Sequence, residues 1–193
     1  MKQVIKRVFR LISVIVVSPL IILIKLLGPS QKASMFRTVS QVVSLFPGIV
    51  GSYLRLATFR FTMKTCKVTG IIHFGTLFSN PDTEIADNVY IGPQCNIGQC
   101  SIGADTMLAS GVHILSGKNQ HSFDTLDKPI QQQGGHYEKI SIGKDCWVGN
   151  GAIVMADIGD HAIVAAGSVV ISQVPAKAIV AGNPAKIIKY RNE

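Results

Sequence analysis

The chain has 193 residues, enough for one domain of ordinary size with an extension. Its formal net charge is +8. Its mean hydropathy is +0.33, and a positive value is unusual for a soluble protein. The basic residues gather near the two ends of the chain and no nucleic-acid-binding module is recognisable. We therefore expect a membrane surface and a phosphorylated cofactor as partners, and no nucleic acid.

The first predicted element is an apolar helix over residues 11–27, preceded by a basic stretch over residues 2–10. About 17 apolar residues are at the lower limit for crossing a bilayer, and Pro19 is expected to kink the helix. A cleaved signal peptide is a competing interpretation, but residues 28–33 lack a small-x-small cleavage pattern. Because basic residues flank both sides, we expect a re-entrant helix in the cytoplasmic leaflet. A true span, or a helix packed on the protein or an oligomer, are the alternatives.

The second predicted element runs from Met35 to Phe61 and is amphipathic. One interpretation places it at the membrane interface, where basic residues meet anionic head groups. The residues expected in that role are Arg37, Arg55, Arg60 and Lys64. The other interpretation is a helix that caps the open end of a β-coil, and the two are compatible. Residues 1–60 are thus predicted to form a helical, membrane-associating segment.

An aliphatic residue then returns every six residues, usually followed by Gly or Ala. The aliphatic positions are Ile85, Ile91, Ile97, Ile102, Leu108, Ile114, Ile142, Val148, Val154, Ile158, Val164 and Val170. This period fits neither a helix nor a long strand, but it is typical of short strands joined by tight corners in a parallel coil. The small residue allows a corner to fold without crowding. We interpret the slips at Ile97–Ile102 and Val154–Ile158 as local deletions at corners, so residues 61–193 are predicted to form an all-β parallel β-helix.

The hexads stop between Ile114 and Ile140, where a protruding loop over residues 115–139 is predicted. Long loops on a regular scaffold are usually functional. The loop contains His121, the best candidate catalyst, and His136, which follows two glycines. His113 and His161 fall at a hexad position and a turn, so we expect both to be structural. The four cysteines, which form no C-x-x-C pair, are expected to be reduced and structural: Cys66, Cys95, Cys100 and Cys146.

The segment from Ile140 to Arg191, with its ending Ala181-Gly182-Asn183-Pro184-Ala185, resembles the hexapeptide-repeat acyltransferases. Within that superfamily it is most similar to the maltose and galactoside acetyltransferases and the polysaccharide O-acetyltransferases. The resemblance covers about residues 70–191. It implies a left-handed β-helix, acetyl-CoA as acyl donor, no metal, and a homotrimer that shares each site between neighbouring subunits.

The run His121-Ser122-Phe123-Asp124 matches the His-x-x-Asp of that branch, which implies that His121 is the general base. Imidazole titrates near neutral pH, so it can accept the hydroxyl proton and return a proton to the leaving thiol. Direct transfer between two bound substrates then needs no acyl-enzyme. Asp124 either orients the ring or contacts the acceptor, and Asp127 is an alternative to it. The other interpretation of His121 is an exposed loop histidine.

The resemblance also implies a set of cofactor contacts. Trp147 would flank the pantetheine arm, Asn150 would lie near the thioester, and Ala166 would offer backbone hydrogen bonds. Lys186 and Lys189 would meet the CoA phosphates, with Arg191 a weaker candidate. The chain has Ile171-Ser172 where relatives commonly have Thr-Lys, which places one adenine-side contact in doubt, and Trp147 could instead be a core aromatic.

Together these observations predict an acetyl-CoA-dependent O-acetyltransferase at the cytoplasmic face of a bacterial inner membrane. Its acceptor would be a sugar hydroxyl of an envelope polysaccharide or lipid-linked glycan, and N-acetylation of an amino sugar is the nearest variant. A γ-type carbonic anhydrase would need three zinc-binding histidines, and the spacing of His113, His121 and His136 does not match that family. A non-catalytic membrane scaffold is the remaining alternative.

Overall fold

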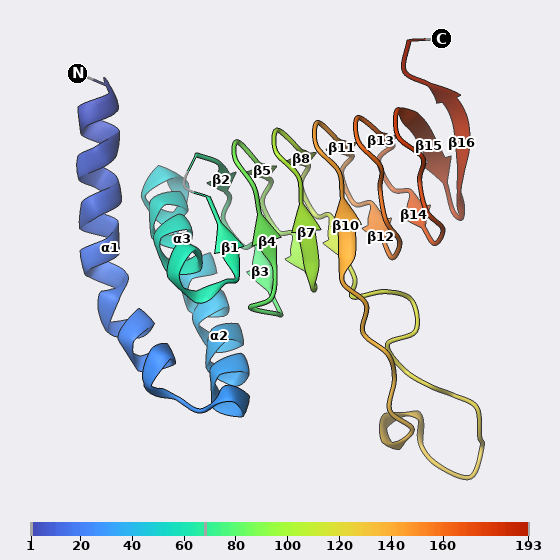
Figure 1. Cartoon of the computed structure of the whole chain (residues 1–193), viewed down its shortest axis with the longest axis horizontal. Helices are drawn as coiled ribbons and strands as arrows, with labels where there is room; N and C mark the ends of the chain where they lie inside the picture. Colours follow the sequence, from blue (N-terminus) through green and yellow to red (C-terminus); the bar gives the residue numbers. More distant parts are fainter. Residues whose placement is uncertain (1, 68, 193) are drawn as a thin grey trace.

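A computed structural model describes residues 2–67 and 69–192 as a parallel β-solenoid with helices at one end (Figure 1). The helices are α1 (Lys2–Leu26), α2 (Pro29–Ser44) and α3 (Gly48–Thr62). A long loop leaves the middle of the solenoid, and an antiparallel pair of strands closes its other end (Figure 1). The buried aliphatic residues of all coils form one continuous core that also includes side chains of the three helices.

The strands form three sheets, which we name A, B and C. Sheet A contains β1 (Thr65–Cys66), β4 (Glu84–Ile85), β7 (Cys100–Ile102) and β10 (Ile140–Ile142), and single bridges at Ile158 and Val174 continue it. Sheet B contains β2 (Ile71–Ile72), β5 (Tyr90–Ile91), β8 (Met107–Leu108), β11 (Trp147–Val148), β13 (Ile163–Val164), β15 (Ala178–Gly182) and β16 (Ala185–Tyr190). Sheet C contains β3 (Leu77–Phe78), β6 (Asn96–Ile97), β9 (His113–Ile114), β12 (Ile153–Val154) and β14 (Val169–Val170). The predicted β-helix of hexapeptide repeats is confirmed.

Every departure from the six-residue spacing falls at the corner between sheet C and sheet A. The unequal steps are Phe78–Ile85, Ile97–Ile102, Ile114–Ile142, Val154–Ile158 and Val170–Val174. The two slips noted in the sequence are therefore corner variations, as predicted. The long loop is the largest change of length at this same corner.

Where glycine follows the aliphatic residue, the neighbouring coil leaves no room for a side chain. A Cβ added to Gly92 would lie 2.7 Å from the carbonyl carbon of Ala109, and one added to Gly149 would lie 2.5 Å from the amide nitrogen of Ala166. The corner between sheets A and B turns by a different means, which was not predicted from the sequence. At this corner the backbone adopts the left-handed conformation at residues other than glycine, with φ between 49° and 63°. These residues are Asn88, Asp105, Asp145, His161 and Lys177.

Helix α1 is continuous through Pro19. Proline cannot donate to the carbonyl of Ile15, and the Ser18 hydroxyl donates to that oxygen instead, at 2.8 Å. One face of α1 packs against α3 through Val17 and Ile21. The opposite face is apolar and exposed: Leu11, Ile12, Ile15, Val16, Ile22, Leu23 and Leu26. By length and composition alone, the helical stretch Gln3–Leu26 could cross a membrane.

Helices α2 and α3 cap the open end of the solenoid, as one of the two interpretations predicted. Pro47 separates them, so the segment from Met35 to Phe61 is two helices and not one. The Phe59 ring packs edge-on against Phe78 at a centroid distance of 4.7 Å. Ser40 of α2 accepts a hydrogen bond from the Phe78 amide at 2.8 Å. The helices thus supply partners to a strand edge that would otherwise be open.

The prediction that Arg55 meets lipid head groups is wrong. Its side chain is fully buried and donates to four main-chain carbonyls: Ile72 (2.9 Å, from Nε) and, from Nη1, Phe46 (2.7 Å), Val43 (3.1 Å) and Ser44 (3.5 Å). Burial lowers the pKa of Arg55 to about 10, so the guanidinium still carries its charge at neutral pH. Arg55 therefore joins α2, α3 and the first coil. Lys64 forms ion pairs within sheet A, described below.

Candidate active site

The loop over residues 115–139 extends away from the coils on a hydrogen-bonded stem (Figure 1). The Glu138 amide donates to the Ser116 carbonyl at 3.0 Å, and the His136 amide donates to the Asn119 carbonyl at 2.8 Å. The Ser122 amide then donates to the Gly134 carbonyl, also at 3.0 Å. The outgoing and returning segments therefore run side by side up to His121.

His121 is exposed on this stem, and its backbone position depends on Gly135. A Cβ added to Gly135 would lie 1.9 Å from the carbonyl oxygen of Gln120 and 2.9 Å from the Cα of His121. Both contacts are to backbone atoms, so neither can be relieved by a side-chain rotation. The returning segment can lie against His121 only because residue 135 has no side chain. Gly135 belongs to the glycine pair noted in the sequence, but its contact with His121 was not predicted.

The tip of the loop is organised by Gln133. Its amide nitrogen donates to the carbonyls of Thr125 and Lys128, both at 2.8 Å, and its amide oxygen accepts from the Thr125 backbone at 3.1 Å. Asp127 accepts the Thr125 hydroxyl at 3.3 Å and is part of this turn. Asp124 is exposed, and in the part of the chain that the structure describes no hydrogen bond joins it to His121.

The base of the loop is fixed to sheet A by an ion-pair cluster. Lys139 Nζ lies 2.6 Å from Glu84 Oε1, and Lys64 Nζ lies 3.0 Å from the same oxygen. The hydrogen bonds from Lys139 and Lys64 hold the pKa of Glu84 below its ordinary value. A hydrogen bond from Gln99, at 2.8 Å, is the main cause that lowers the pKa of the neighbouring Asp82. This cluster defines where the returning segment rejoins the coil.

A cavity of about 190 Å³ lies on sheet C beside the outgoing segment of the loop. Asn96 and His113 line it from adjacent strands, and Gln120, the residue before His121, lines it from the loop. His113 was predicted to be structural, but its side chain is exposed on the outer face of sheet C. A polar molecule in this cavity would therefore contact groups on both the coil and the loop.

Three of the predicted cofactor residues lie on neighbouring coils. Trp147 is half exposed on the outer face of sheet B, paired with Met107 on one side and Ile163 on the other, so it is not a core aromatic. Asn150 and Ala166 are stacked at the corner between sheets B and C, where the Gly167 amide donates to the Asn150 carbonyl at 2.8 Å.

Lys186 and Lys189 are exposed on β16, the edge strand of sheet B. With the three residues on the coils they form a track that runs along one side of the solenoid toward its C-terminal end. Arg191 has a different role, since its guanidinium donates to the Asp145 carboxylate and to the His161 carbonyl, both at 3.1 Å. His161 also lies 2.9 Å from that carboxylate, so it is structural, as predicted.

His121 is not on the side of the solenoid that carries this track. The loop leaves at the corner between sheets C and A, whereas the track follows sheet B and the corner between sheets B and C. Sheet C separates the two within one subunit.

The remaining titratable candidates are separate from this site. All four cysteines are free and buried, and burial raises the pKa of Cys66 and of Cys100 to about 12. Among the residues that the structure describes, no group of three or more His, Cys, Asp or Glu is arranged to hold a metal ion.

Solved structures with the same fold are numerous. No protein-family model matches the chain. The chain shares the fold of a maltose O-acetyltransferase from Clostridium difficile 630. That structure has a TM-score of 0.68 at 19% identity, over 85% of this chain and 88% of the other. A hexapeptide-repeat acetyltransferase from Vibrio cholerae has a TM-score of 0.59 at 17% identity, over 84% and 94% of the two chains.

A third solved structure is that of AntD, an N-acyltransferase from Bacillus cereus, in complex with dTDP and 3-hydroxybutyryl-CoA. Its TM-score is 0.51 at 15% identity, over 69% of this chain and 86% of the other. At these identities the likeness establishes the fold alone.

Proposed function

We propose that the protein is an acetyl-CoA-dependent O-acetyltransferase that uses His121 as general base in a direct transfer to a sugar hydroxyl. The observation that carries the proposal is the loop itself. It presents an exposed imidazole on a stem fixed by three hydrogen bonds and by the close approach of Gly135. The second side of the proposed active site is the track of Trp147, Asn150 and Ala166. Its small residues and the exposed indole of Trp147 leave room for the pantetheine arm of acetyl-CoA to lie against the coil. The maltose O-acetyltransferase and the acyl-CoA complex of AntD, which share the fold, support acyl transfer with this architecture.

In the reaction, the acceptor oxygen attacks the thioester carbonyl while His121 takes the hydroxyl proton. The C–S bond then breaks and the imidazolium returns the proton to the CoA sulfur, so the products are the acetyl ester and CoA. Holding both substrates in line supplies much of the acceleration. Asp124, exposed three residues after His121, is available to contact the acceptor. The cavity beside Gln120 and His113 is where we place the acceptor sugar.

A homotrimer completes the site in this proposal. His121 and the cofactor track lie on different sides of one solenoid, so one subunit alone does not bring them together. A neighbouring subunit packed against sheet C would bring its own track next to the loop. The apolar side chains exposed on the loop, Phe123, Leu126, Ile130 and Tyr137, would be covered in such an assembly.

The proposed acceptor is a lipid-linked or envelope glycan at the cytoplasmic face of a bacterial inner membrane. The exposed apolar face of α1 supports membrane association, and three copies in a trimer would strengthen a weak membrane contact by avidity. N-acylation of an amino sugar is the second candidate. A further AntD structure, in complex with dTDP-4-amino-4,6-dideoxyglucose and CoA, supports it with a TM-score of 0.53 at 17% identity, over 63% of this chain and 70% of the other.

The test is release of free CoA from acetyl-CoA by the full chain in neutral detergent, against neutral sugars, amino sugars and extracted lipid-linked glycans. With an accepted sugar, His121→Ala should lower kcat by roughly 10²- to 10⁴-fold, the usual contribution of a general base. Acetyl-CoA binding should be unchanged, while Lys186→Gln with Lys189→Gln should weaken that binding and spare the chemistry. Turnover by His121→Ala at the wild-type rate would refute the assignment of the base. Turnover only with amino sugars would favour the second candidate.

A further inference from the structure

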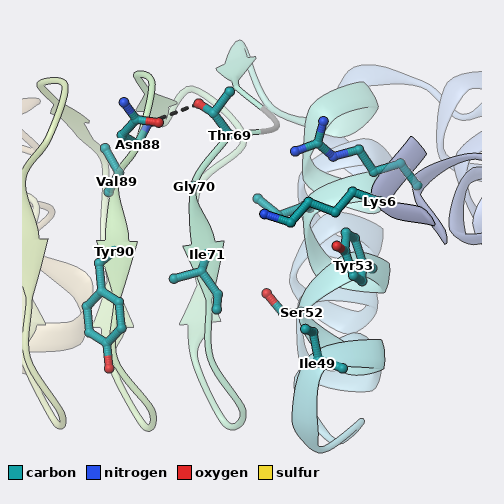
Figure 2. Close-up of a pocket in the computed structure, with 12 residues that line it drawn as sticks. Lys6, Ile49, Ser52, Tyr53, Thr69, Gly70, Ile71, Asn88, Val89 and Tyr90 are labelled. Atoms are coloured by element: carbon teal, nitrogen blue, oxygen red, sulfur yellow. Dashed lines mark hydrogen bonds between the residues drawn. The ribbon is translucent and has the colours of Figure 1, made fainter. Parts of the chain in front are cut away.

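A second cavity, lined by none of the residues of the loop, lies where α1 and α3 meet the first two coils of sheet B. It has a volume of about 400 Å³ and is walled by α1, α3, β2 with the residues just before it, and β5 with the residues just before it (Figure 2). Figure 2 shows Lys6 and Ser52 directed from the helices toward β2. None of the predicted catalytic or cofactor residues lines this cavity, so acyl transfer does not account for it.

The cationic groups of the cavity come from one face of α1. Lys6 and Arg10 are one helical turn apart, and both line the cavity. Arg10 Nε is buried and has no hydrogen-bond partner among the described residues. A buried guanidinium donor without a partner is unfavourable, because its desolvation is not offset, and an anionic oxygen is the acceptor that would offset it most effectively.

Among the described residues, no carboxylate is paired with either of these two cations. The first acidic residue in the chain is Asp82, so the helices carry only positive charges. The acidic residues nearest the rim of the cavity are bonded elsewhere: Asp87 accepts the Thr69 hydroxyl at 2.8 Å, and Asp105 accepts the Asn88 side chain at 3.1 Å. No ion pair of Lys6 or Arg10 occurs in the described ranges 2–67 and 69–192.

Neutral hydroxyl groups surround the same space. Ser52 accepts the Ile72 amide at 3.4 Å, which leaves its own proton free to be donated into the cavity. Tyr53, held by stacking on Phe9 at 5.8 Å, and Tyr90 also line it. Two cations with several hydroxyl donors match the several acceptor oxygens of a phosphate group.

The position of the cavity on α1 identifies the source of that phosphate. Apolar side chains are exposed around the cavity: Ile49 of α3, which lines it, and Ile5 and Phe9 of α1, which are adjacent in sequence to Lys6 and Arg10. A molecule with its phosphate at Lys6 and Arg10 could therefore place an alkyl chain over these exposed side chains. A soluble phosphate would make no use of this surface.

We propose that this cavity binds the phosphate group of a membrane lipid, with the lipid chain over the exposed side chains of Ile49, Ile5 and Phe9 at its edge. The proposal is independent of acyl transfer, because lipid binding is measured without turnover. If the cavity binds a lipid phosphate, the protein recognises that group specifically. A basic surface attracted to an anionic bilayer would not distinguish one anionic lipid from another.

The test uses the full chain in neutral detergent and measures binding of short-chain phosphatidic acid by calorimetry, with inorganic phosphate in a parallel titration. Lys6→Gln should weaken phosphatidic acid binding about tenfold, and the double variant with Arg10→Gln by a further factor of about ten, as expected for charged hydrogen bonds. Arg7→Gln is the matched control, because Arg7 is exposed on the same helix and does not line the cavity. Its effect should stay below about twofold.

Three outcomes would overturn the proposal. Equal losses in Lys6→Gln and Arg7→Gln would show a diffuse electrostatic attraction. Inorganic phosphate bound as tightly as phosphatidic acid would indicate a site for a soluble anion. Absence of phosphatidic acid binding to the wild type would exclude the site altogether. Lys6 is exposed, so its single variant remains informative even if Arg10→Gln impairs folding.

Discussion

Replacing Arg55 by Met should detach the helical cap from the β-solenoid. The guanidinium makes three hydrogen bonds of 2.7–3.1 Å to carbonyls of Phe46, Val43 and Ile72, and Met can make none of them. Hydrogen bonds to a charged group contribute about 1.5–3 kcal/mol each, but bonds that share one side chain are not additive. We therefore expect the free energy of unfolding to fall by about 3–5 kcal/mol. For a chain of this size that corresponds to a melting temperature lower by roughly 6–20 °C.

The assay is thermal unfolding in detergent, combined with hydrogen exchange of the intact protein. Exchange should accelerate at the end of α2 and around β2, where the freed carbonyls lie, and should not change in sheet C beyond the loop. Arg60→Met is the control, since Arg60 is exposed on the same helix and its loss should cost at most about 0.5 kcal/mol. The reasoning would be refuted by an Arg55→Met protein that melts within about 2 °C of the wild type.

Two further predictions concern the catalytic loop. Gly135→Ala should displace the backbone at His121 and lower kcat by roughly 10²-fold, with acetyl-CoA affinity and melting temperature nearly unchanged. The control is Gln131→Ala, at an exposed position of the same loop. An unchanged kcat in Gly135→Ala would show that Gly135 does not position the base. The folded-state pKa of Glu84 is lowered, so its ion pairs stabilise the protein above its ordinary pKa of 4.5 and this contribution is lost as the pH falls through the folded value. Melting temperatures recorded from about pH 7 to about pH 3.5 should therefore fall less steeply for Glu84→Gln than for the wild type, and equal slopes would contradict the assigned role.

The β-helix could be predicted because each coil imposes the same requirement on the sequence. An aliphatic residue fills the interior at most of the sixth positions, and the next residue is usually small because the adjacent coil lies against its Cα, as at Gly92 and Gly149. The departures from the six-residue spacing did not obscure the pattern, because all of them fall at the corner between sheets C and A. The left-handed residues between sheets A and B were missed because Asn88, Asp145 and Lys177 share no residue type, only a backbone conformation.

The candidate site was predictable only in part. Trp147, Asn150 and Ala166 keep a fixed phase in the repeat, so their positions on the coils follow from the register. The hydrogen-bond partners of a side chain depend on tertiary contacts, and the apolar periodicity of a helix does not predict these contacts. An arginine on an amphipathic helix looks the same in sequence whether it faces lipid, as was expected of Arg55, or binds carbonyls in the interior. His113 is the opposite case, because its hexad position suggested a structural role and the coil exposes it beside the loop.

The order of sites along the solenoid links the two proposals. The cavity proposed to bind phosphate is walled by β2 and β5 of the first two coils, the loop with His121 leaves after β9 of the third, and the track of predicted cofactor residues continues from β11 to β16. Adjacent strands are about 4.8 Å apart, so the cavity and the base of the loop are separated by only about 5–10 Å along the axis. Because the cavity lies on the side of sheet B, a lipid-linked acceptor held there by its phosphate would present its sugar to the loop of a neighbouring subunit in the proposed trimer. Acetyl-CoA would approach from the opposite end, away from the membrane, so neither substrate would obstruct the other.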